Sequence, residues 1–451
     1  MIYFNDVTKF SSDLKNRNVF LFPLLRNNKH PAKNSIISLF IKSPDSPNTY
    51  VFNFDHQDID GMNSTARELF EKVIMICKKI FVLDKKTYLY SFPTSDKVVD
   101  IQLVEHQFGN NISEEISNLT NKLDVFFEGS EKIINEVIPM SKHIQRFLSI
   151  NSMVEKTIMD FKPHESFEYS NNIVTEILFG IEKSGLYIDR EKFNNYFSDR
   201  GIIESDDFVY TQYNLLTSTG RPSNRFEKVN YAALNTENGC RESFVSRFGS
   251  DGCLCNFDYN AYHPHIIASQ INYKVGVDEN IYEIFAKEYF SKTEVSAEEI
   301  KYAKNKTFQN LYGNICEDLM RVDFFRLTKD YIDNRWNFFS ENGYVETFVF
   351  KRKITNNHIK DPNPNKLFNY LLQAAELEYF VSKMKIVLDI LKGYKTLPIL
   401  YTYDSVLFDF YKPDGVELIR EIRRNMVNNT FPVKVHLGKD YGNLLEITNR
   451  L

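Results

Sequence analysis

Two apolar stretches, each with an aspartate at the end of an expected strand, constrain the fold more than any other feature of the sequence. Residues 253–268, CLCNFDYNAYHPHIIA, begin as a strand, reach Asp258, and then resume the apolar spacing of a helix. Residues 397–410, LPILYTYDSVLFDF, hold two short apolar runs around Asp404, which predicts a β-hairpin with a carboxylate at its tip. A fold that brings these strands together would place the two carboxylates at one point.

Two converging carboxylates form a typical ligand set for Mg²⁺, which prefers oxygen and is commonly shared with substrate phosphates. Two such ions stabilise the attacking and leaving oxygens of an in-line phosphoryl transfer. Each aspartate taken alone is more simply explained as an ordinary turn or helix-start residue, because aspartate is common at both. The segments between the two aspartates therefore decide between these interpretations.

The composition sets limits on the class of protein. A chain of 451 residues with 43% hydrophobic content predicts two or three domains with large cores. The net charge of −5 does not signal a nucleic-acid partner, so any such partner would need a local basic groove. Five cysteines without paired spacing argue against a disulfide framework and against a structural zinc site.

The first residues, MIYFNDVTKF, do not have the shape of a signal peptide, and no apolar run approaches the length of a membrane span. We therefore expect a soluble, cytoplasmic protein without a membrane partner; in a phage-encoded protein this would be the host cytoplasm.

Residues 1–110 alternate between strand-like and helix-like patterns, which predicts an α/β domain with a mixed sheet. The expected strands lie at 19–25, 35–43, 49–54, 81–86, 88–92 and 98–104, and the expected helices at 66–80 and within 112–160. A metal-dependent 3′–5′ exonuclease needs carboxylates at the end of its first strand. Residues 19–43 contain no acidic residue, so a nuclease site here would lack its metal ligands.

A turn-rich basic segment, TSTGRPS, starts at residue 217 and carries Arg221, and Arg241 follows it. Both arginines are candidates for contacts to phosphate or to a nucleic-acid groove. A solvated basic loop explains their composition equally well.

Residues 296–314 predict a helix on which Lys301, Lys304, Phe308 and Tyr312 recur at steps of three or four and share one stripe. Two lysines and two aromatic rings on one face suit a nucleotide, because lysine meets phosphates as a point charge and rings stack on bases. The alternative is a surface helix whose aromatic side chains belong to the core.

A long helix is expected at 363–392, where Asn369 and Gln373 interrupt a nearly continuous apolar pattern. The remaining expected elements are a helix, a break and a second helix within 171–199, a strand or hairpin at 343–354, a helix at 413–428 and a strand at 432–437.

Five segments occur in a specific order: TSTGRPS, FDYNAYHPHIIA, a helix with K-x-x-x-F-x-x-x-Y-G, LFNYLLQAAELEY and TYDSVLFDF. In this order they resemble the polymerase half of family A DNA polymerases, over roughly 171–445. The resemblance implies an α+β and α/β multidomain protein: a right-hand polymerase fold with palm, fingers and a very small thumb, preceded by a ribonuclease H-like exonuclease-type α/β domain. The implied domains are a degenerate exonuclease-like domain at 1–165, a reduced thumb or connector at 166–216, palm at 217–272, fingers at 273–360 and palm at 361–451.

The resemblance implies a template-directed DNA polymerase that uses two Mg²⁺ ions, primer-template DNA and deoxynucleoside triphosphates. Asp258 and Asp404 match the family's two metal-binding aspartates, with the main-chain carbonyl of Tyr259 as a further ligand. Lys304 and Phe308 match the residues that contact the triphosphate and stack on the incoming nucleotide.

Further matches concern the nucleic acid. Tyr312 matches the template-side tyrosine of the family, and Arg221 matches the arginine that contacts the minor groove of the primer-template. Asn369 and Gln373 match a polar pair beside the duplex, and we add Arg241 as a DNA-binding candidate from its charge.

The sequence departs from the family pattern at several positions. His263 stands where the family usually has a glutamate that excludes the ribose 2′-hydroxyl, and Ile300 replaces an arginine for which Lys301 can substitute. Tyr403 and Ser405 replace the usual histidine and glutamate around the second aspartate. Because single-subunit phage RNA polymerases also carry Asp-Ser there, an RNA-synthesising or priming relative is one alternative, and a non-catalytic nucleic-acid-binding remnant is another.

The segment between residues 189 and 217 is short for the helical thumb that the family places there. We therefore expect weak grip on the duplex, and either low processivity or a separate processivity or single-strand-binding partner. The N-terminal domain stands where the family's proofreading exonuclease lies, and we expect it to be inactive. A compact polymerase of this kind is typical of a phage or another virus.

Overall fold

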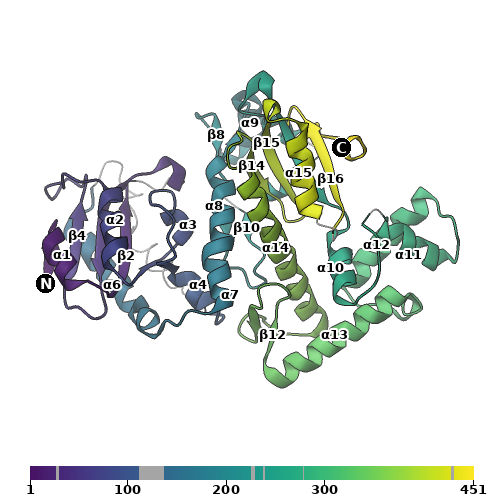
Figure 1. The fold of residues 1–451 in the computed structure, drawn as a ribbon, viewed down its shortest axis with the longest axis horizontal. Coiled ribbons are helices and arrows are strands. Elements are labelled where there is room, and N and C mark those ends of the chain that lie inside the picture. The colour runs from purple at the N-terminus through teal and green to yellow at the C-terminus, as the bar shows by residue number, and fades with distance from the viewer. Residues whose placement is uncertain (27–29, 111–136, 225–228, 237–238, 278, 428–430) are drawn as a thin grey trace. The chain divides into compact units, whose positions relative to one another are not determined.

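The computed structural model describes the chain except residues 27–29, 111–136, 225–228, 237–238, 278 and 428–430. The chain forms two compact units, Met1–Phe179 and Gly180–Leu451 (Figure 1). Among the described residues, no helix is both long and apolar enough to cross a membrane. The expected finer division into thumb, palm and fingers stays a prediction.

The first unit is built on a six-stranded mixed sheet with the order β1-β4-β3-β2-β5-β6. Strands β2, β3 and β4 pair antiparallel, whereas β5 and β6 continue the sheet in parallel from β2, and β1 pairs in parallel with β4. The strands are β1 (Ile2–Phe4), β2 (Asn18–Leu25), β3 (Ile36–Lys42), β4 (Thr49–Asn53), β5 (Lys79–Val82) and β6 (Val98–Asp100). The mixed sheet expected from the sequence is therefore confirmed.

Both faces of this sheet are covered, which explains why its strands are apolar almost throughout. Leu21 of β2 joins a core with Phe70 of α2, while Phe20 stacks on Phe147 of α6 with ring centroids 5.6 Å apart. The helices of this unit are α1 (Val7–Asp13), α2 (Ala66–Ile76), α3 (Lys85–Tyr88), α4 (Ile101–His106), α6 (Met140–Asp160), α7 (Glu165–Glu168), the π-helix η2 (Tyr169–Val174) and the start of α8 (Thr175–Ser184).

Four sequence expectations in this unit need correction. The strand expected at 81–86 ends at Val82 of β5, and Lys85 and Lys86 start the short helix α3. The strand expected at 88–92 is wrong, because Asp84 caps the short helix α3, which runs through Tyr88 and ends in turns. The strand expected at 98–104 ends at Asp100, whose side chain accepts from the backbone of Gln102 and Leu103 and starts α4. The helix expected at 66–80 ends at Ile76, and the part of the second helical region at 111–136 lies outside the described residues.

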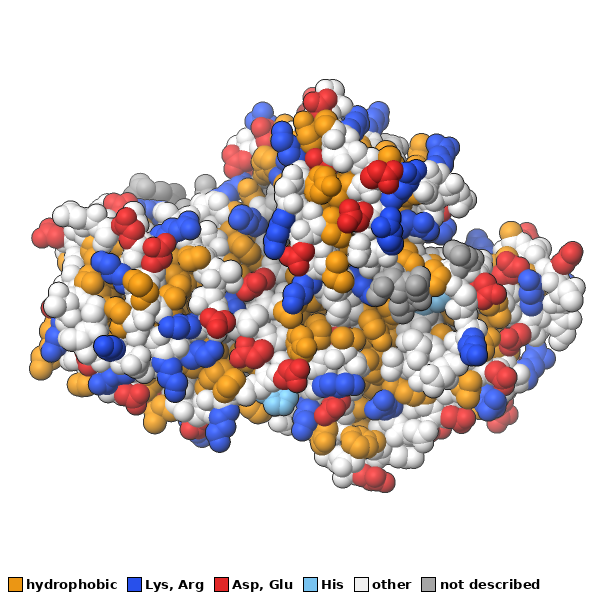
Figure 2. All heavy atoms as spheres, viewed as in Figure 1, with side chains coloured by type: hydrophobic (Ala, Val, Ile, Leu, Met, Phe, Trp, Pro, Cys, Tyr) orange, Lys and Arg blue, Asp and Glu red, His pale blue; other side chains and the backbone are white. Residues whose placement is uncertain are grey.

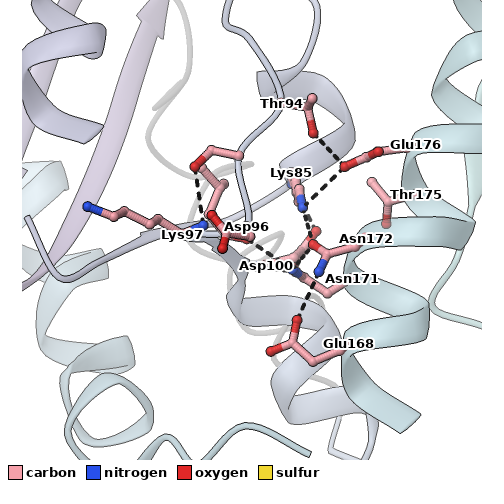
Figure 3. Close-up of polar contacts among 12 residues, drawn as sticks. Lys85, Thr94, Asp96, Lys97, Asp100, Glu168, Asn171, Asn172, Thr175 and Glu176 are labelled. Atoms are coloured by element: carbon pink, nitrogen blue, oxygen red, sulfur yellow. Dashed lines mark hydrogen bonds and ion pairs between the residues drawn. The ribbon is translucent and has the colours of Figure 1, made fainter. Parts of the chain in front are cut away.

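A buried polar cluster joins the ends of β5 and β6 to the π-helix (Figure 3). The fully buried Lys85 donates from Nζ to Asn172 Oδ1 at 2.5 Å and lies 3.9 Å from Glu176 Oε1. Asn171 accepts from the backbone N–H of Asp100 and donates to a main-chain carbonyl of the same strand, each at 2.9 Å. Since the buried members of this cluster, Lys85, Asp100 and Asn171, each have polar partners, the cluster stabilises the first unit.

The second unit is built on a five-stranded antiparallel sheet with the order β14-β15-β11-β16-β17. Its strands are β11 (Gly252–Tyr259), β14 (Leu397–Tyr401), β15 (Ser405–Tyr411), β16 (Val433–Gly438) and β17 (Leu445–Glu446). Helices α14 (Pro364–Ile390) and α15 (Val416–Val427) pack against each other beside this sheet (Figure 1). The hairpin predicted around Asp404 is formed by β14 and β15.

The remaining helices of the second unit lie outside this sheet. They are α9 (Arg190–Phe197), α10 (Tyr262–Gln270), α11 (Ile281–Phe290), α12 (Ala297–Tyr312) and α13 (Asp323–Asn342). Short strands complete the unit: β7 (Leu186–Tyr187), β8 (Phe208–Val209), β9 (Tyr213–Asn214), β10 (Ser223–Asn224), β12 (Tyr344–Glu346) and β13 (Lys353–Thr355). Residues 190–216 thus provide one eight-residue α-helix, α9, with short turns and strands.

Charged side chains are interspersed on the face that Figure 2 shows, so that neither sign covers a large area there. This matches the small net charge of the chain. Positive contacts to a polyanion on this face would therefore have to come from individual side chains.

A buried ion pair connects the sheet of the second unit to the segment before β11. Asp409 on β15 is completely buried and accepts from Arg247 Nε at 2.7 Å and from the Arg247 backbone N–H at 3.1 Å. Arg247 also donates from Nη2 to the carbonyl of Gly185 at 2.8 Å. Removal of one partner leaves the other buried without its counter-charge, which is strongly destabilising.

We predict that Asp409→Asn lowers the free energy of unfolding by roughly 2–4 kcal/mol. Denaturant unfolding measures this change. Lys392→Ala, which breaks an exposed pair with Asp389 on the surface, is the control and should leave the unfolding midpoint unchanged. An Asp409→Asn midpoint equal to the wild-type value would contradict the role of this pair.

Candidate active site

The pairing of β11 with β15 places the two predicted aspartates side by side. Asp258 lies opposite Ser405 in this register, and the backbone N–H of Tyr259 donates to the carbonyl of Asp404 at 2.8 Å. Thr402 closes the turn by donating from its backbone to the carbonyl of Ser405 at 2.9 Å. The two carboxylates are therefore fixed near each other by main-chain hydrogen bonds.

Two residues at this site have left-handed backbone conformations that side chains other than glycine rarely adopt. Tyr403, at the hairpin tip, has φ of 76°, and Ala261, between β11 and α10, has φ of 50°. Such a conformation costs on the order of 1–2 kcal/mol per residue and is concentrated at functional sites. The guanidinium of Arg221 lies 3.7 Å from the centroid of the Tyr403 ring, and this contact stabilises the strained tip.

Both aspartates line a cavity of about 240 Å³ in the second unit. Its walls come from the basic turn at 217–223, the junction of β11 and α10, helices α11, α12 and α14, and the β14–β15 hairpin. The lining residues are Arg221, Asp258, Tyr259, Asn260, Ala261, Tyr262, His263, Pro264, Tyr282, Lys304, Phe308, Tyr312, Glu376 and Asp404.

Helix α12 supplies a cationic and aromatic wall. Its start is fixed by a capping box between Ser296 and Glu299. Phe308 and Tyr312 stack with ring centroids 5.9 Å apart and planes 9° apart, and Lys304 Nζ lies 5.8 Å from the ring centroid of Tyr282 on α11. Three residues of the predicted stripe therefore reach the cavity.

The fourth residue of the stripe does not reach it. Lys301 lies nearly one turn closer to the start of α12, is exposed, and is not among the residues that line the cavity. Its expected contact with a nucleotide stays a prediction that the geometry does not support.

The predicted DNA-binding residues outside the cavity have other surroundings. Arg241 donates from Nε and Nη2 to the carbonyl of Leu234, at 3.2 and 2.9 Å, and lies over the ring of Tyr441. Asn369 and Gln373 are half-buried on α14, and Asn369 Oδ1 is buried without a hydrogen-bond partner among the described residues.

Glu376 is a residue of the cavity that the sequence did not reveal. It lies on α14, is 2% exposed, and accepts from His263 Nε2 at 3.1 Å. Arg221 Nε forms an ion pair with the same carboxylate oxygen at 3.3 Å, and His263 Nδ1 is hydrogen-bonded to the hydroxyl of Tyr312. Two acidic residues, Glu376 and Glu378, within the most apolar part of this helix were the signal that could have found it, because buried carboxylates need partners.

Burial and neighbouring negative charges destabilise the ionised form of both aspartates. Burial, and then the negative charge of Asp404, raise the pKa of Asp258 to about 7, although Lys434 and Lys304 act in the opposite direction. Burial, and then the negative charge of Glu376, raise the pKa of Asp404. A bound cation would relieve both effects.

The donor groups fit Mg²⁺ that is shared with a phosphate-bearing ligand. The described residues include no group of three or more histidine, cysteine, aspartate or glutamate side chains that could hold a metal ion. The two carboxylates, with the carbonyl of Tyr259 if it is a ligand as expected, would leave most ligand positions to phosphate oxygens and water, which is the arrangement that Mg²⁺ favours.

No protein-family model and no curated protein sequence matches this chain. Among solved structures, it is similar to the POL domain of Pol1 from M. smegmatis, in a complex with DNA primer-template and dNTP. The two share 14% sequence identity over 98% of each chain, with a TM-score of 0.70. The chain has the fold of a polymerase POL domain. The polymerase fold class predicted from the sequence is therefore confirmed.

We predict that Asp258→Asn stabilises the protein at pH 8 by roughly 1–3 kcal/mol when a chelator is present. The pKa of Asp258 is raised from 3.8 to about 7 by folding, so its ionisation opposes folding above pH 7. The difference should shrink as the pH falls and vanish near pH 4, where the carboxyl is protonated in both states. Thermal unfolding as a function of pH measures this difference.

The matched control is Asp251→Asn, in the exposed turn just before β11, which should not change the unfolding midpoint at either pH. Equal stabilities of Asp258→Asn and the wild type at pH 8 would contradict the raised pKa of Asp258.

Proposed function

We propose that this chain is a template-directed DNA polymerase that adds deoxynucleotides to a primer 3′ end by two-metal-ion phosphoryl transfer. One observation carries the proposal: a single cavity joins two adjacent carboxylates to a lysine and a pair of stacked rings. The similarity to a POL domain described with primer-template DNA and dNTP supports the same conclusion.

Asp258, Asp404 and the main-chain carbonyl of Tyr259 would hold two Mg²⁺ ions. When bound, these ions activate the primer hydroxyl and stabilise the negative charge that develops on the phosphates. Lys304 adds a fixed positive charge for the triphosphate, and its amine needs no reorganisation during the reaction. Phe308 offers its ring to the incoming base and sugar.

The same proposal assigns the nucleic acid to the residues around the cavity. Tyr312 would pack where the template base arrives, and Arg221 would contact the minor groove of the primer-template. Three further proposed DNA contacts lie outside the cavity lining, so the cavity geometry does not support them: Arg241, Asn369 and Gln373.

We propose that the first unit does not proofread. Strand β2, which would carry the first metal ligands of an exonuclease, has no acidic residue. Asp84, at the end of β5, accepts from the backbone N–H and hydroxyl of Thr87, at 3.0 and 2.8 Å, and Asp100 caps α4. These carboxylates thus serve as helix caps, which supports a structural role for this unit.

The short segment at 190–216 offers little surface to the duplex, which supports weak binding of primer-template DNA. A processivity or single-strand-binding partner is therefore part of the proposal. Replication of a phage or other viral genome is the setting that we propose for so compact a polymerase.

We predict that the protein with Mg²⁺ extends a DNA primer with deoxynucleotides, and that Asp404→Ala reduces the rate at least 10³-fold, on the order expected for loss of a metal ligand. Products of one binding event, measured with a DNA trap, should be short. Gel analysis of labelled primers provides the measurement.

The control for Asp404→Ala is Asp251→Asn, which should extend the primer at the wild-type rate. Equal extension with ribonucleotides would favour an RNA-synthesising relative. DNA binding without extension, by the wild type and with all four nucleotides, would contradict the proposed activity and favour a non-catalytic remnant.

We predict that the protein does not shorten a primer with a mismatched 3′ end in the presence of Mg²⁺. Labelled single-stranded and mismatched duplex substrates, incubated without nucleotides, measure this. Release of 3′ nucleotides that persists in Asp404→Ala would contradict the structural role of the first unit.

A further inference from the structure

Glu376 determines the hydrogen-bonding state of His263. A carboxylate only accepts hydrogen bonds, so His263 Nε2, 3.1 Å from Glu376 Oε2, must carry a proton. In the neutral ring, Nδ1 is then an acceptor, and the hydroxyl of Tyr312 donates to it. Both ring nitrogens of His263 are thus engaged by fixed partners.

The same carboxylate connects residues from several segments that line the cavity. Its Oε2 atom pairs with Arg221, whose guanidinium covers the ring of Tyr403 next to Asp404. The imidazole of His263, which also contacts this carboxylate, is hydrogen-bonded to the hydroxyl of Tyr312, and the ring of Tyr312 stacks on that of Phe308. The buried Glu376 thus fixes the positions of side chains from several elements that line the cavity.

This geometry has a consequence for a sugar that lies against His263. With both nitrogens engaged, the ring offers no free polar partner to a hydroxyl group. A hydroxyl buried there without a partner costs about 1–3 kcal/mol, whereas a sugar without that hydroxyl does not incur this cost.

We propose that Glu376 is a specificity-determining positioning residue, which holds His263 against the nucleotide sugar and so makes the cavity favour deoxynucleotides over ribonucleotides. This inference rests on the proposed function and deepens it. Glu376 acts through His263, and it need not contact the reacting atoms.

The test measures the ratio of ribonucleotide to deoxynucleotide dissociation constants, by titration of a complex with a dideoxy-terminated primer-template and Mg²⁺. The same ratio is measured in single-nucleotide extension. Glu376→Ala should reduce the preference for deoxynucleotides about tenfold, whereas Glu376→Gln, which keeps an acceptor oxygen, should retain most of it.

Two further variants distinguish a role of Glu376 in positioning His263 from a general loss of stability. In a His263→Ala background, Glu376→Ala should change the ratio no further, because its effect passes through the imidazole. Asp409→Asn, which removes the charge of a buried carboxylate elsewhere in the second unit, should lower stability and leave the ratio unchanged.

The outcomes distinguish this inference from the proposed activity. A preference that is unchanged in Glu376→Ala, or additive effects with His263→Ala, would overturn the inference even if the protein extends primers. A changed binding ratio without extension would support the inference and contradict the activity. If Glu376→Ala does not fold, Tyr312→Phe is the alternative variant. It removes the hydrogen bond from the half-exposed Tyr312 to His263. An unchanged ratio of dissociation constants in this variant would also overturn the inference.

Discussion

The alignment of β11 with β15 is the constraint on which the site depends. The strands are joined by a regular antiparallel register, and this register brings Asp258 and the hairpin tip together regardless of the charges involved. Burial raises the pKa of both carboxyl groups, with a smaller contribution from Asp404 for Asp258 and from Glu376 for Asp404, so the sheet holds the carboxylates where their ionised forms are unfavourable. Two ionised carboxylates held close together in a buried site destabilise the protein without a metal ion, but they favour the binding of a cation.

Helix α14 adds the second constraint. Its long apolar surface packs in the interior, and this burial fixes the position of Glu376 beside the cavity. The carboxylate then orients Arg221 on one side and His263 on the other. Three segments that are remote in the sequence thereby form one wall, with the strained Tyr403 stabilised under Arg221.

Local patterns predicted much of the fold and part of the site. The hairpin around Asp404 and the shared face of Lys304, Phe308 and Tyr312 depend on strand and helix periods, which a sequence contains directly. The strand expected at 88–92 failed because a capping side chain, Asp84, outweighed the strand propensity of an aromatic run.

Long-range contacts explain what the sequence did not reveal. Glu376 and His263 are 113 residues apart, so no local period relates them. Arg241 was selected for its charge, and the sequence did not reveal that its guanidinium donates to the carbonyl of Leu234; its contact with DNA stays a prediction. Such partners are set by tertiary packing, and only the folded chain identifies them.

Binding of Mn²⁺, observed by electron paramagnetic resonance, tests the central claim most directly. With a dideoxy-terminated primer-template and a deoxynucleotide present, the account predicts about two ions per protein, in line with a two-metal site. Replacement of both Asp258 and Asp404 by asparagine should abolish this binding. Unchanged Mn²⁺ binding in the double variant would show that the two carboxylates are not the metal site.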